Sequence, residues 1–245
     1  MSLPVHLVPD LGGSAVGSVV TITGDEAHHA VAVRRLRVGE QLMVVDGRGT
    51  VVTGTISETG KRELSVVVDD LSLHQEPTPS VTVVQAIPKG DRGELAVEVL
   101  TEIGVATIVP WAAARSVAVW KGERAEKSHA RWAATAREAA KQARRAWFPT
   151  VAPMATTGQV KTIIAGSDLA VVLHEAATTT FETLPTPTGR VVLIVGPEGG
   201  LTEDEVAAFE AAGARTVRMG TEVLRTSTAG VAAASALLSR TPRWF

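Results

Sequence analysis

The sequence contains no cysteine and no tyrosine, and these two absences exclude several classes of function. Without cysteine the chain has no disulfide bond, no thiolate metal ligand and no thiol nucleophile. With four phenylalanines and five tryptophans, it also has too few aromatic side chains to predict a sheet on which RNA bases stack. Any contact with nucleic acid is therefore expected to depend on arginine and lysine.

Long hydrophobic runs and metal-ligand motifs are also missing. No stretch approaches the ~18 apolar residues expected of a membrane-spanning helix. The first fifteen residues lack the basic start and long apolar core of a signal peptide. The six histidines show no HExxH or similar spacing, so no metal site is expected. Together with the lack of cysteine, these features predict a soluble protein of the cytoplasm.

The chain has 245 residues, 45% of them apolar, which is enough for one or two domains. Its character changes at "LHQEPTPS", residues 73–80. Short β-rich runs separated by glycine turns precede this stretch, and strand-like and helical runs alternate after it. We therefore predict a small β-barrel domain in residues 1–73 and an α/β domain with a parallel sheet in residues 78–245.

Apolar runs and breakers predict the elements of both domains. In the barrel, one short basic helix is expected within "DEAHHAVAVRRLR", residues 25–37. In the α/β domain, a helix is expected over 92–104, and a long one from about Glu123 to Trp147, before Pro149. Strands are expected at 81–87, 107–111, 168–176, 190–196 and 215–220.

The stretch "IVGPEGGLTEDEV", residues 194–206, predicts a strand that enters a glycine turn and then a helix. Thr202 and Glu205 form a capping box, and Glu203 and Asp204 add acids to the first turn. A phosphate bound there would meet three negative charges, and the run matches neither GxGxxG nor GxxxxGK[ST]. The motif therefore predicts a ligand without phosphate, held by backbone groups. An ordinary turn that needs a positive φ is the alternative.

Two further segments, 171–176 and 217–237, also end apolar strands and enter loops. The second continues through Gly220 and "LRT" into a helix rich in Ala, Ser and Gly, which allows close packing of another backbone. In a parallel sheet, three such loops converge at the carboxyl ends of the strands, where α/β proteins place ligands. We expect one ligand site formed by all three loops.

At this point several motifs resemble a known family. "IVGPEGGLTEDEV", "MGTEVLRTSTA", "PKGDRGELAVEVLTEIGVATIVP" and "REAAKQARR" are similar to the SPOUT class of methyltransferases. They are more closely similar to the RsmE-type family, which methylates N3 of a uridine in bacterial small-subunit (16S) rRNA. The resemblance extends over nearly the whole chain, including "HHAVAVRRLRVGE".

The resemblance implies a PUA-like β-barrel followed by a SPOUT-type α/β domain with a C-terminal trefoil knot. Knotted chains are exceptions to the usual connection rules, so the knot is expected from the family alone. The resemblance also implies a homodimer, S-adenosylmethionine as cofactor, and 16S rRNA within the assembled small subunit as partner. By motif position, the cofactor contacts are expected at Leu173, His174, Glu175, Gly196, Pro197, Glu198, Gly199, Gly200, Leu201, Met219, Gly220, Leu224, Arg225 and Thr226.

Residues 115–145 carry nine Lys or Arg and three Glu, a net charge of +6, whereas the whole chain carries −2. Such a region is typical of a protein that binds a polyanion, although a solvated charged helix is the alternative. On a helix of 100° per residue, one apolar face is predicted to hold Trp132, Ala136, Ala139, Ala140, Ala143 and Trp147. A second, polar face is predicted to hold Arg131, Glu138, Gln142 and Arg145.

In the resembling family, the pattern "EAxxQxxR" lies near the target nucleotide, which implies a catalytic site containing Glu138, Gln142 and Arg145. Arg225, Arg145 and Arg115 are expected to orient the base and stabilise charge on its oxygens. Glu138 is the candidate general base for the N3 proton. Contacts to rRNA are expected at Arg34, Arg35, Arg37, Lys89, Arg92, Arg131, Lys141 and Arg144.

Two departures from the family pattern remain. The family usually has an acid two residues after the arginine of "LRT", where this chain has Ser227, and the start "LPVHLV" lacks the usual arginine and aromatics. One alternative is a SPOUT methyltransferase that acts on 2′-hydroxyls or on tRNA. The other is a non-catalytic RNA-binding or ribosome-assembly protein that Ser227 has disabled. The target nucleotide is not predictable from the sequence.

Overall fold

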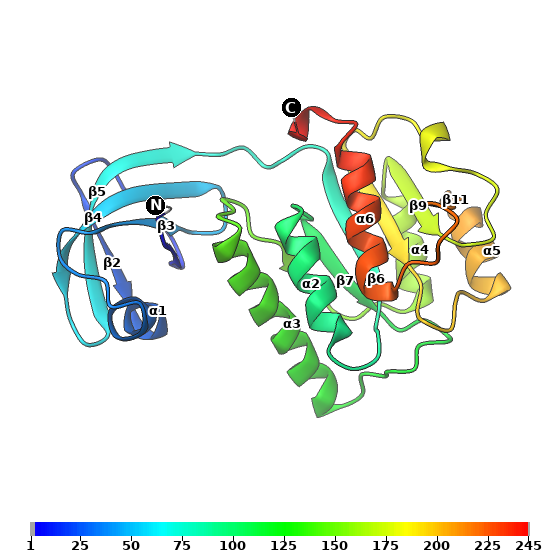
Figure 1. The fold of residues 1–245 in the computed structure, drawn as a ribbon, viewed down its shortest axis with the longest axis horizontal. Helices are drawn as coiled ribbons and strands as arrows, with labels where there is room; N and C mark the ends of the chain where they lie inside the picture. Colours follow the sequence, from blue (N-terminus) through cyan, green and yellow to red (C-terminus); the bar gives the residue numbers. More distant parts are fainter. Residues whose placement is uncertain (1–2, 245) are drawn as a thin grey trace. The chain divides into compact units, whose positions relative to one another are not determined.

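The computed structural model describes residues 3–244 and divides the chain into two compact units. Unit 1 consists of Met1–Glu76 together with Lys141–Phe148, and unit 2 consists of Pro77–Ala140 together with Pro149–Phe245. The chain thus leaves unit 1, forms part of unit 2, and returns to unit 1 for eight residues. Each unit is described by itself below (Figure 1).

Unit 1 is built on a five-stranded sheet in the order β1-β3-β4-β5-β2. Its strands are β1 (Val5–Leu7), β2 (Val19–Thr23), β3 (Gln41–Val45), β4 (Thr50–Thr59) and β5 (Glu63–Leu73). β1 pairs with β3 in parallel, and the other pairs are antiparallel. Alternate side chains such as Val20 and Ile22 point into the core, as expected for strands with one buried face.

The basic helix expected over residues 25–37 is shorter than predicted. The structure forms α1 (Gly24–His28) and continues as a π-helix, η1 (His29–Val33). Arg35 has a φ of 57°, and a right-handed helix cannot continue through a residue with positive φ. Arg34, Arg35 and Arg37 therefore lie after the helix, where all three side chains are exposed.

Unit 2 contains a six-stranded sheet in the order β11-β9-β10-β6-β7-β8. Its strands are β6 (Ser80–Ala86), β7 (Thr107–Trp111), β8 (Thr150–Val151), β9 (Leu169–Leu173), β10 (Arg190–Val195) and β11 (Arg215–Val217). Every pair is parallel, which confirms the predicted α/β class. β10 lies between β6 and β9, so segments far apart in sequence are neighbours at the centre.

Helices cover both faces of this sheet (Figure 1). They are α2 (Arg92–Glu102), α3 (Glu123–Gln142), α4 (Thr157–Ala165), α5 (Glu203–Ala211) and α6 (Thr226–Leu238). α2, α3 and α6 bury their apolar side chains on one face, and α4 and α5 on the other. Gly230 lets α6 approach α2 closely, since a Cβ there would lie 3.1 Å from Leu100 Cδ2. Within residues 3–244, no helix combines the length and apolar composition needed to cross a membrane.

The prediction that the long basic helix reaches Trp147 is wrong, because α3 ends at Gln142. Arg144 has a φ of 53°, and the following residues hydrogen-bond within unit 1 instead of continuing the helix. The Gly49 N–H donates to the Ala146 carbonyl at 3.0 Å, and the Trp147 indole donates to the His74 carbonyl at 2.8 Å. The predicted apolar face is confirmed within the helix, where Trp132, Ala136, Ala139 and Ala140 are buried.

A buried ionic cluster joins residue 141 to the rest of unit 1. Lys141 Nζ donates to Glu26 Oε1 at 2.7 Å, and His6 Nδ1 lies 3.3 Å from Glu26 Oε2. Burial raises the pKa of the Glu26 carboxyl, but hydrogen bonds from His6 and Lys141 and their charge outweigh it and lower that pKa from 4.5 to about 2. The ionised form of Glu26 is therefore favoured in the folded protein.

This cluster predicts a loss of stability in acid. A carboxyl whose pKa is lower in the folded protein stabilises it above the unfolded pKa, and this contribution disappears as pH falls from about 4.5 to about 2. We expect the free energy of unfolding of the wild type to fall by about 3 kcal/mol more than that of Glu26→Gln over this range. Urea denaturation at several pH values measures the difference. Glu58→Gln, at an exposed acid of β4, is the control and should follow the wild type.

Candidate functional site

A cavity of about 510 Å³ lies where three neighbouring strands of unit 2 end. Leu173 at the end of β9, Val195 at the end of β10 and Val217 at the end of β11 line it, together with the loops that follow. Arg92 and Arg115, which follow β6 and β7, line the same cavity. The carboxyl edge of a parallel sheet is where such folds bind ligands.

The three predicted loops meet in this cavity. All of the residues predicted to contact the cofactor lie on its wall: Leu173, His174, Glu175, Gly196, Pro197, Glu198, Gly199, Gly200, Leu201, Met219, Gly220, Leu224, Arg225 and Thr226. The cavity is also lined by residues that were not predicted from the sequence: Val195, Val217, Arg218, Thr221, Glu222, Val223 and Ala229. Each lies within three positions of a predicted residue in the chain, so continuing each loop to its neighbouring strand end or helix start would have found them.

The glycine loop has the predicted capping box at its end. The Glu205 N–H donates to Thr202 Oγ1 at 3.1 Å, and the Thr202 N–H donates to Glu205 Oε2 at 3.0 Å. The first turn of α5 is thus satisfied by its own side chains and carries three acids. This geometry supports a ligand without phosphate at the loop.

Glycine is required in this loop for two different reasons. Gly200 has a φ of 73°, as the alternative of an ordinary turn predicted. Gly199 approaches another chain segment closely, because a Cβ there would lie 3.0 Å from both Cβ and the carbonyl oxygen of Arg115. A larger residue at 199 would push the loop after β7 away from the cavity wall.

Two segments that follow β6 and β7 hold the glycine loop. Arg115 Nη1 lies 3.3 Å from the Leu201 carbonyl and 3.4 Å from the Gly199 carbonyl. The Lys89 N–H donates to Glu198 Oε1 at 3.2 Å. The loop is thus fixed by contacts from neighbouring strand ends rather than by its own residues alone.

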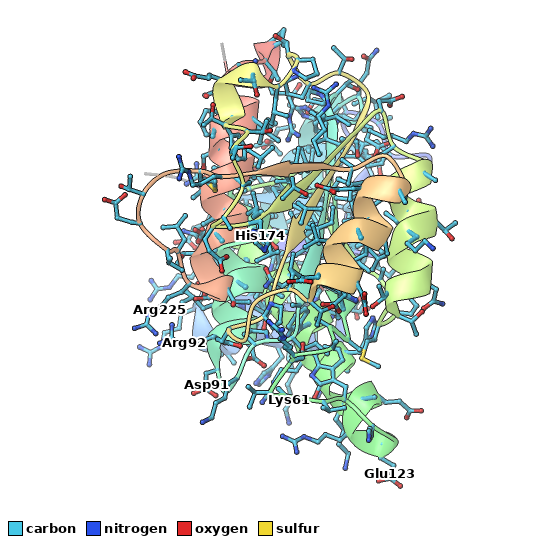
Figure 2. The ribbon with its side chains drawn as sticks, turned by 90° about the vertical axis from the view of Figure 1, so that its right-hand side faces the viewer. Lys61, Asp91, Arg92, Glu123, His174 and Arg225 are labelled. Atoms are coloured by element: carbon cyan, nitrogen blue, oxygen red, sulfur yellow. The ribbon has the colours of Figure 1, made fainter. Side chains whose placement is uncertain are left out.

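Two arginines that line the cavity lie at helix starts. Figure 2 shows Arg92, the first residue of α2, and Arg225, the residue before α6, on the same side of the molecule. In the described part of the chain, no side chain caps the start of α6, so its first N–H groups and positive dipole end add to the charge of Arg225. This side of the cavity favours negative charge.

Ser227, at the position of the expected family acid, does not line the cavity. Its side chain is 2% exposed, and within residues 3–244 its Oγ has no hydrogen-bond partner. A carboxylate at this place would be buried beneath the start of α6. The acids that do line the cavity are Glu175, Glu198 and Glu222.

The predicted polar face of the basic helix does not form as a single surface. Arg145 lies beyond the end of α3, so the prediction that it shares a helix face with Glu138 and Gln142 is wrong. Glu138 Oε1 lies 3.5 Å from the neighbouring Arg137 Nε. Glu138, Gln142 and Arg145 are not among the residues that line the cavity.

The residues predicted to bind rRNA have different surroundings. Arg34, Arg35, Arg37, Lys89 and Arg144 are exposed, and Arg92 lines the cavity. Arg131 pairs with Glu94 of α2, and the Lys141 side chain is 11% exposed against Glu26. Lys141 is thus engaged within unit 1 and is a weaker candidate for a phosphate contact, whereas Arg131 keeps 64% of its side chain exposed beside Glu94. In the described part of the chain, no three histidine or acidic side chains are grouped to hold a metal ion.

Comparisons with known proteins match both units. A model of the RNA methyltransferase domain matches residues 74–238, and a model of the RNA methyltransferase PUA domain matches residues 22–69. The chain is 42% identical over 245 residues to the ribosomal RNA small subunit methyltransferase E of Mycobacterium bovis, covering 98% of this chain and 92% of that protein. It is 33% identical to the Bacillus subtilis protein of the same name, covering 90% of each.

Solved structures with bound cofactor share this fold. The ribosomal RNA small subunit methyltransferase E of Neisseria gonorrhoeae, solved with S-adenosylmethionine, is 26% identical with a TM-score of 0.86. The similarity covers 97% of this chain and 98% of that one. A Legionella pneumophila protein, also solved with the cofactor, is 27% identical with a TM-score of 0.89 and 98% of both chains covered.

Proposed function

The chain belongs to the RNA methyltransferase family whose members include the ribosomal RNA small subunit methyltransferases E, and from this membership we propose its reaction. The protein transfers a methyl group from S-adenosylmethionine to N3 of a uridine in 16S rRNA. The observation that carries this proposal is the cavity in which all three predicted loops meet. The loops come from adjacent parallel strands, so the site is formed by the fold of unit 2 itself.

The residues of the cavity fit S-adenosylmethionine. Leu173, Leu201 and Met219 supply apolar wall for an adenine ring, and the glycine loop leaves its backbone groups accessible. Glu175, Glu198 and Glu222 suit the positive charges of the sulfonium and amino groups. The cofactor has no phosphate, which agrees with the acids at the start of α5.

The proposed chemistry divides between cofactor and protein. S-adenosylmethionine, when bound, supplies an electrophilic methyl group and leaves as S-adenosylhomocysteine after N3 attacks that carbon. N3 of uridine carries a proton, so the protein must remove it and stabilise the negative charge that develops on the base oxygens. Arg225 and Arg115 are the cavity arginines we assign to charge stabilisation and orientation. Arg145 is assigned by the family pattern alone.

Glu138 remains the proposed general base, and Gln142 is proposed to lie next to the target uridine. Neither residue lines the cavity of a single chain. We expect Glu138→Gln to lower kcat by about 100-fold near neutral pH, with part of the rate recovered as pH rises and uridine ionises by itself. Initial rates across pH on small subunits measure this. Glu126→Gln, at an exposed acid in the first turn of the same helix, is the matched control. Normal turnover of Glu138→Gln at every pH would show that another group removes the proton.

The wider assembly follows from the family and forms part of the proposal. We propose a homodimer, a C-terminal trefoil knot in unit 2, and the assembled small subunit in the cytoplasm as the substrate. Unit 1 contributes the exposed basic residues Arg34, Arg35 and Arg37 to rRNA binding, which suits its match to a PUA domain.

Two measurements test the proposed function. Calorimetry should detect binding of S-adenosylmethionine to the purified protein, and its absence would leave the non-catalytic alternative. Methyl groups should then be mapped on rRNA from a deletion strain, with the gene restored as control. Loss of one N3-methyluridine is the expected result. Loss of a 2′-O-methyl group, loss of a tRNA methyl group, or an unchanged methylation pattern would reject the proposed reaction.

A further inference from the structure

We propose that Glu205 is a positioning residue of the cavity, which holds Arg115 in place through the backbone of Ala114. This inference rests on the proposed function, because the cavity is taken to be the cofactor site. The Glu205 side chain is 4% exposed, and its two oxygens have different partners. One oxygen completes the cap of α5, and the other reaches the loop after β7.

These hydrogen bonds form a network that connects the glycine loop to the loop after β7. Glu205 Oε2 accepts from the Thr202 N–H, and Glu205 Oε1 accepts from the Ala114 N–H at 2.8 Å. Ala114 is followed by Arg115, whose guanidinium lies 3.3 Å from the Leu201 carbonyl. The loop from Gly199 to Thr202 is therefore held at its end by Glu205 and along its length by Arg115.

A second helix of this chain shows what capping alone requires. α4 begins with the same box, in which the Thr156 N–H donates to Gln159 Oε1 at 2.8 Å and the Gln159 N–H donates to Thr156 Oγ1 at 3.3 Å. Gln159 is exposed and completes its box with a single oxygen. The cap of α5 therefore needs only one oxygen as well. The second oxygen of Glu205 serves the contact with Ala114.

Burial makes this second contact specific for a carboxylate. A buried charge is tolerated when hydrogen bonds compensate it, and Glu205 accepts from two backbone N–H groups and lies 3.2 Å from the Thr202 hydroxyl. A glutamine here would keep one oxygen for the cap but turn an NH₂ group toward the Ala114 N–H. The two donors repel, so the loop that carries Arg115 must move.

The tight packing of that loop passes the movement to the cavity. The backbone of Arg115 lies so close to Gly199 that a Cβ at 199 would be 3.0 Å from its carbonyl oxygen. A shift of the loop after β7 thus changes both the contact of Arg115 with Leu201 and the space at the glycine loop. Glu205 acts through these neighbours and touches no substrate itself.

The test compares Glu205→Gln with Asp204→Asn, which removes one negative charge from the same turn at an exposed side chain. We expect Glu205→Gln to speed hydrogen exchange of the Ala114 amide and to weaken binding of S-adenosylmethionine, each by about 10-fold. Asp204→Asn should change neither. Unchanged exchange at Ala114, or equal loss of affinity in the two variants, would overturn the proposal.

Arg115→Ala separates positioning from a general loss of structure. It should weaken cofactor binding about as much as Glu205→Gln, and the double variant should be no weaker than Arg115→Ala alone. Unchanged affinity of Arg115→Ala, or additive losses in the double variant, would overturn the proposal even if Glu205→Gln folded poorly. A wild type that binds no S-adenosylmethionine would refute the proposed function, and exchange at Ala114 would still test the contact.

Discussion

Replacing Arg225 with alanine is expected to lower kcat for methyl transfer by about 100-fold or more, with a smaller change in the affinity for S-adenosylmethionine. Arg225 precedes the first turn of α6 and lines the cavity, so its charge adds to the positive end of that helix. In the proposed reaction negative charge develops on the uracil oxygens. A fixed cation therefore stabilises the transition state more than it stabilises the ground state, in which the uracil is neutral. Steady-state kinetics on small subunits, together with cofactor titration, separate the two effects.

Arg215→Ala is the matched control for this experiment. Arg215 begins β11, at the opposite end of the strand that leads toward Arg225, and its side chain is exposed. It removes the same formal charge without touching the cavity wall, and we expect kcat to stay within about twofold of the wild type. A similar fall of kcat in both variants would mean that Arg225 acts through the overall positive charge that attracts rRNA, and not by stabilising charge on the uracil.

Gly49→Ala is expected to lower the stability of unit 1 by about 3 kcal/mol or more. Gly49 has a φ of 103°, and a Cβ there would lie 2.6 Å from the His74 carbonyl oxygen and 2.7 Å from the Trp147 indole nitrogen. The new methyl group meets the hydrogen bond between those two residues. Both backbone strain and loss of that contact therefore contribute. Urea denaturation followed by tryptophan fluorescence measures the change.

Gly39→Ala isolates the strain from the steric clash. Gly39 has a φ of 88°, but no described atom other than those of its chain neighbours lies within 4 Å of its ideal Cβ. We expect Gly39→Ala to lower the free energy of unfolding only by the cost of the backbone conformation, about 1 kcal/mol. Equal losses at positions 39 and 49 would contradict the assigned role of Gly49 as the contact point for Trp147 and His74.

The order of elements in unit 2 was predictable because its strands are apolar runs and its helices carry clear signals. The runs 107–111 and 190–196 became β7 and β10, and the box of Thr202 and Glu205 starts α5 as predicted. α4 was missed although Thr156 and Gln159 form the same kind of box in the sequence. This capping box is visible in the sequence and could have predicted the start of α4.

The end of α3 was not predictable from local sequence. Ala, Arg and Trp continue the helical pattern to residue 147, and no glycine marks the point at which Arg144 turns to a positive φ. The helix ends because the next residues hydrogen-bond to Gly47, Gly49 and His74, which lie about seventy or more positions earlier. Such tertiary contacts override propensity and leave no pattern of period 3.6.

The candidate site was predictable where it consists of loops after strands. Three loops read along the chain meet in one cavity because adjacent parallel strands end at one edge. Its charge pairs were less accessible to sequence analysis. Lys141 was expected to face RNA, yet its partner Glu26 lies 115 positions away. The same holds for Arg131 with Glu94, since nothing in a helical wheel shows which side chains of another helix face it.

The return of residues 141–148 to unit 1 has a consequence for biosynthesis and for cloning. A ribosome that has released only the first 76 residues has not yet made Lys141, Trp147 or Phe148, which pair with Glu26, His74 and Gly47. Unit 1 therefore cannot complete its folding during translation until a large part of unit 2 has also emerged. For the same reason, a fragment cut at the composition change near residue 76 lacks a structural segment. An expression fragment for unit 1 needs residues 141–148 joined back to it.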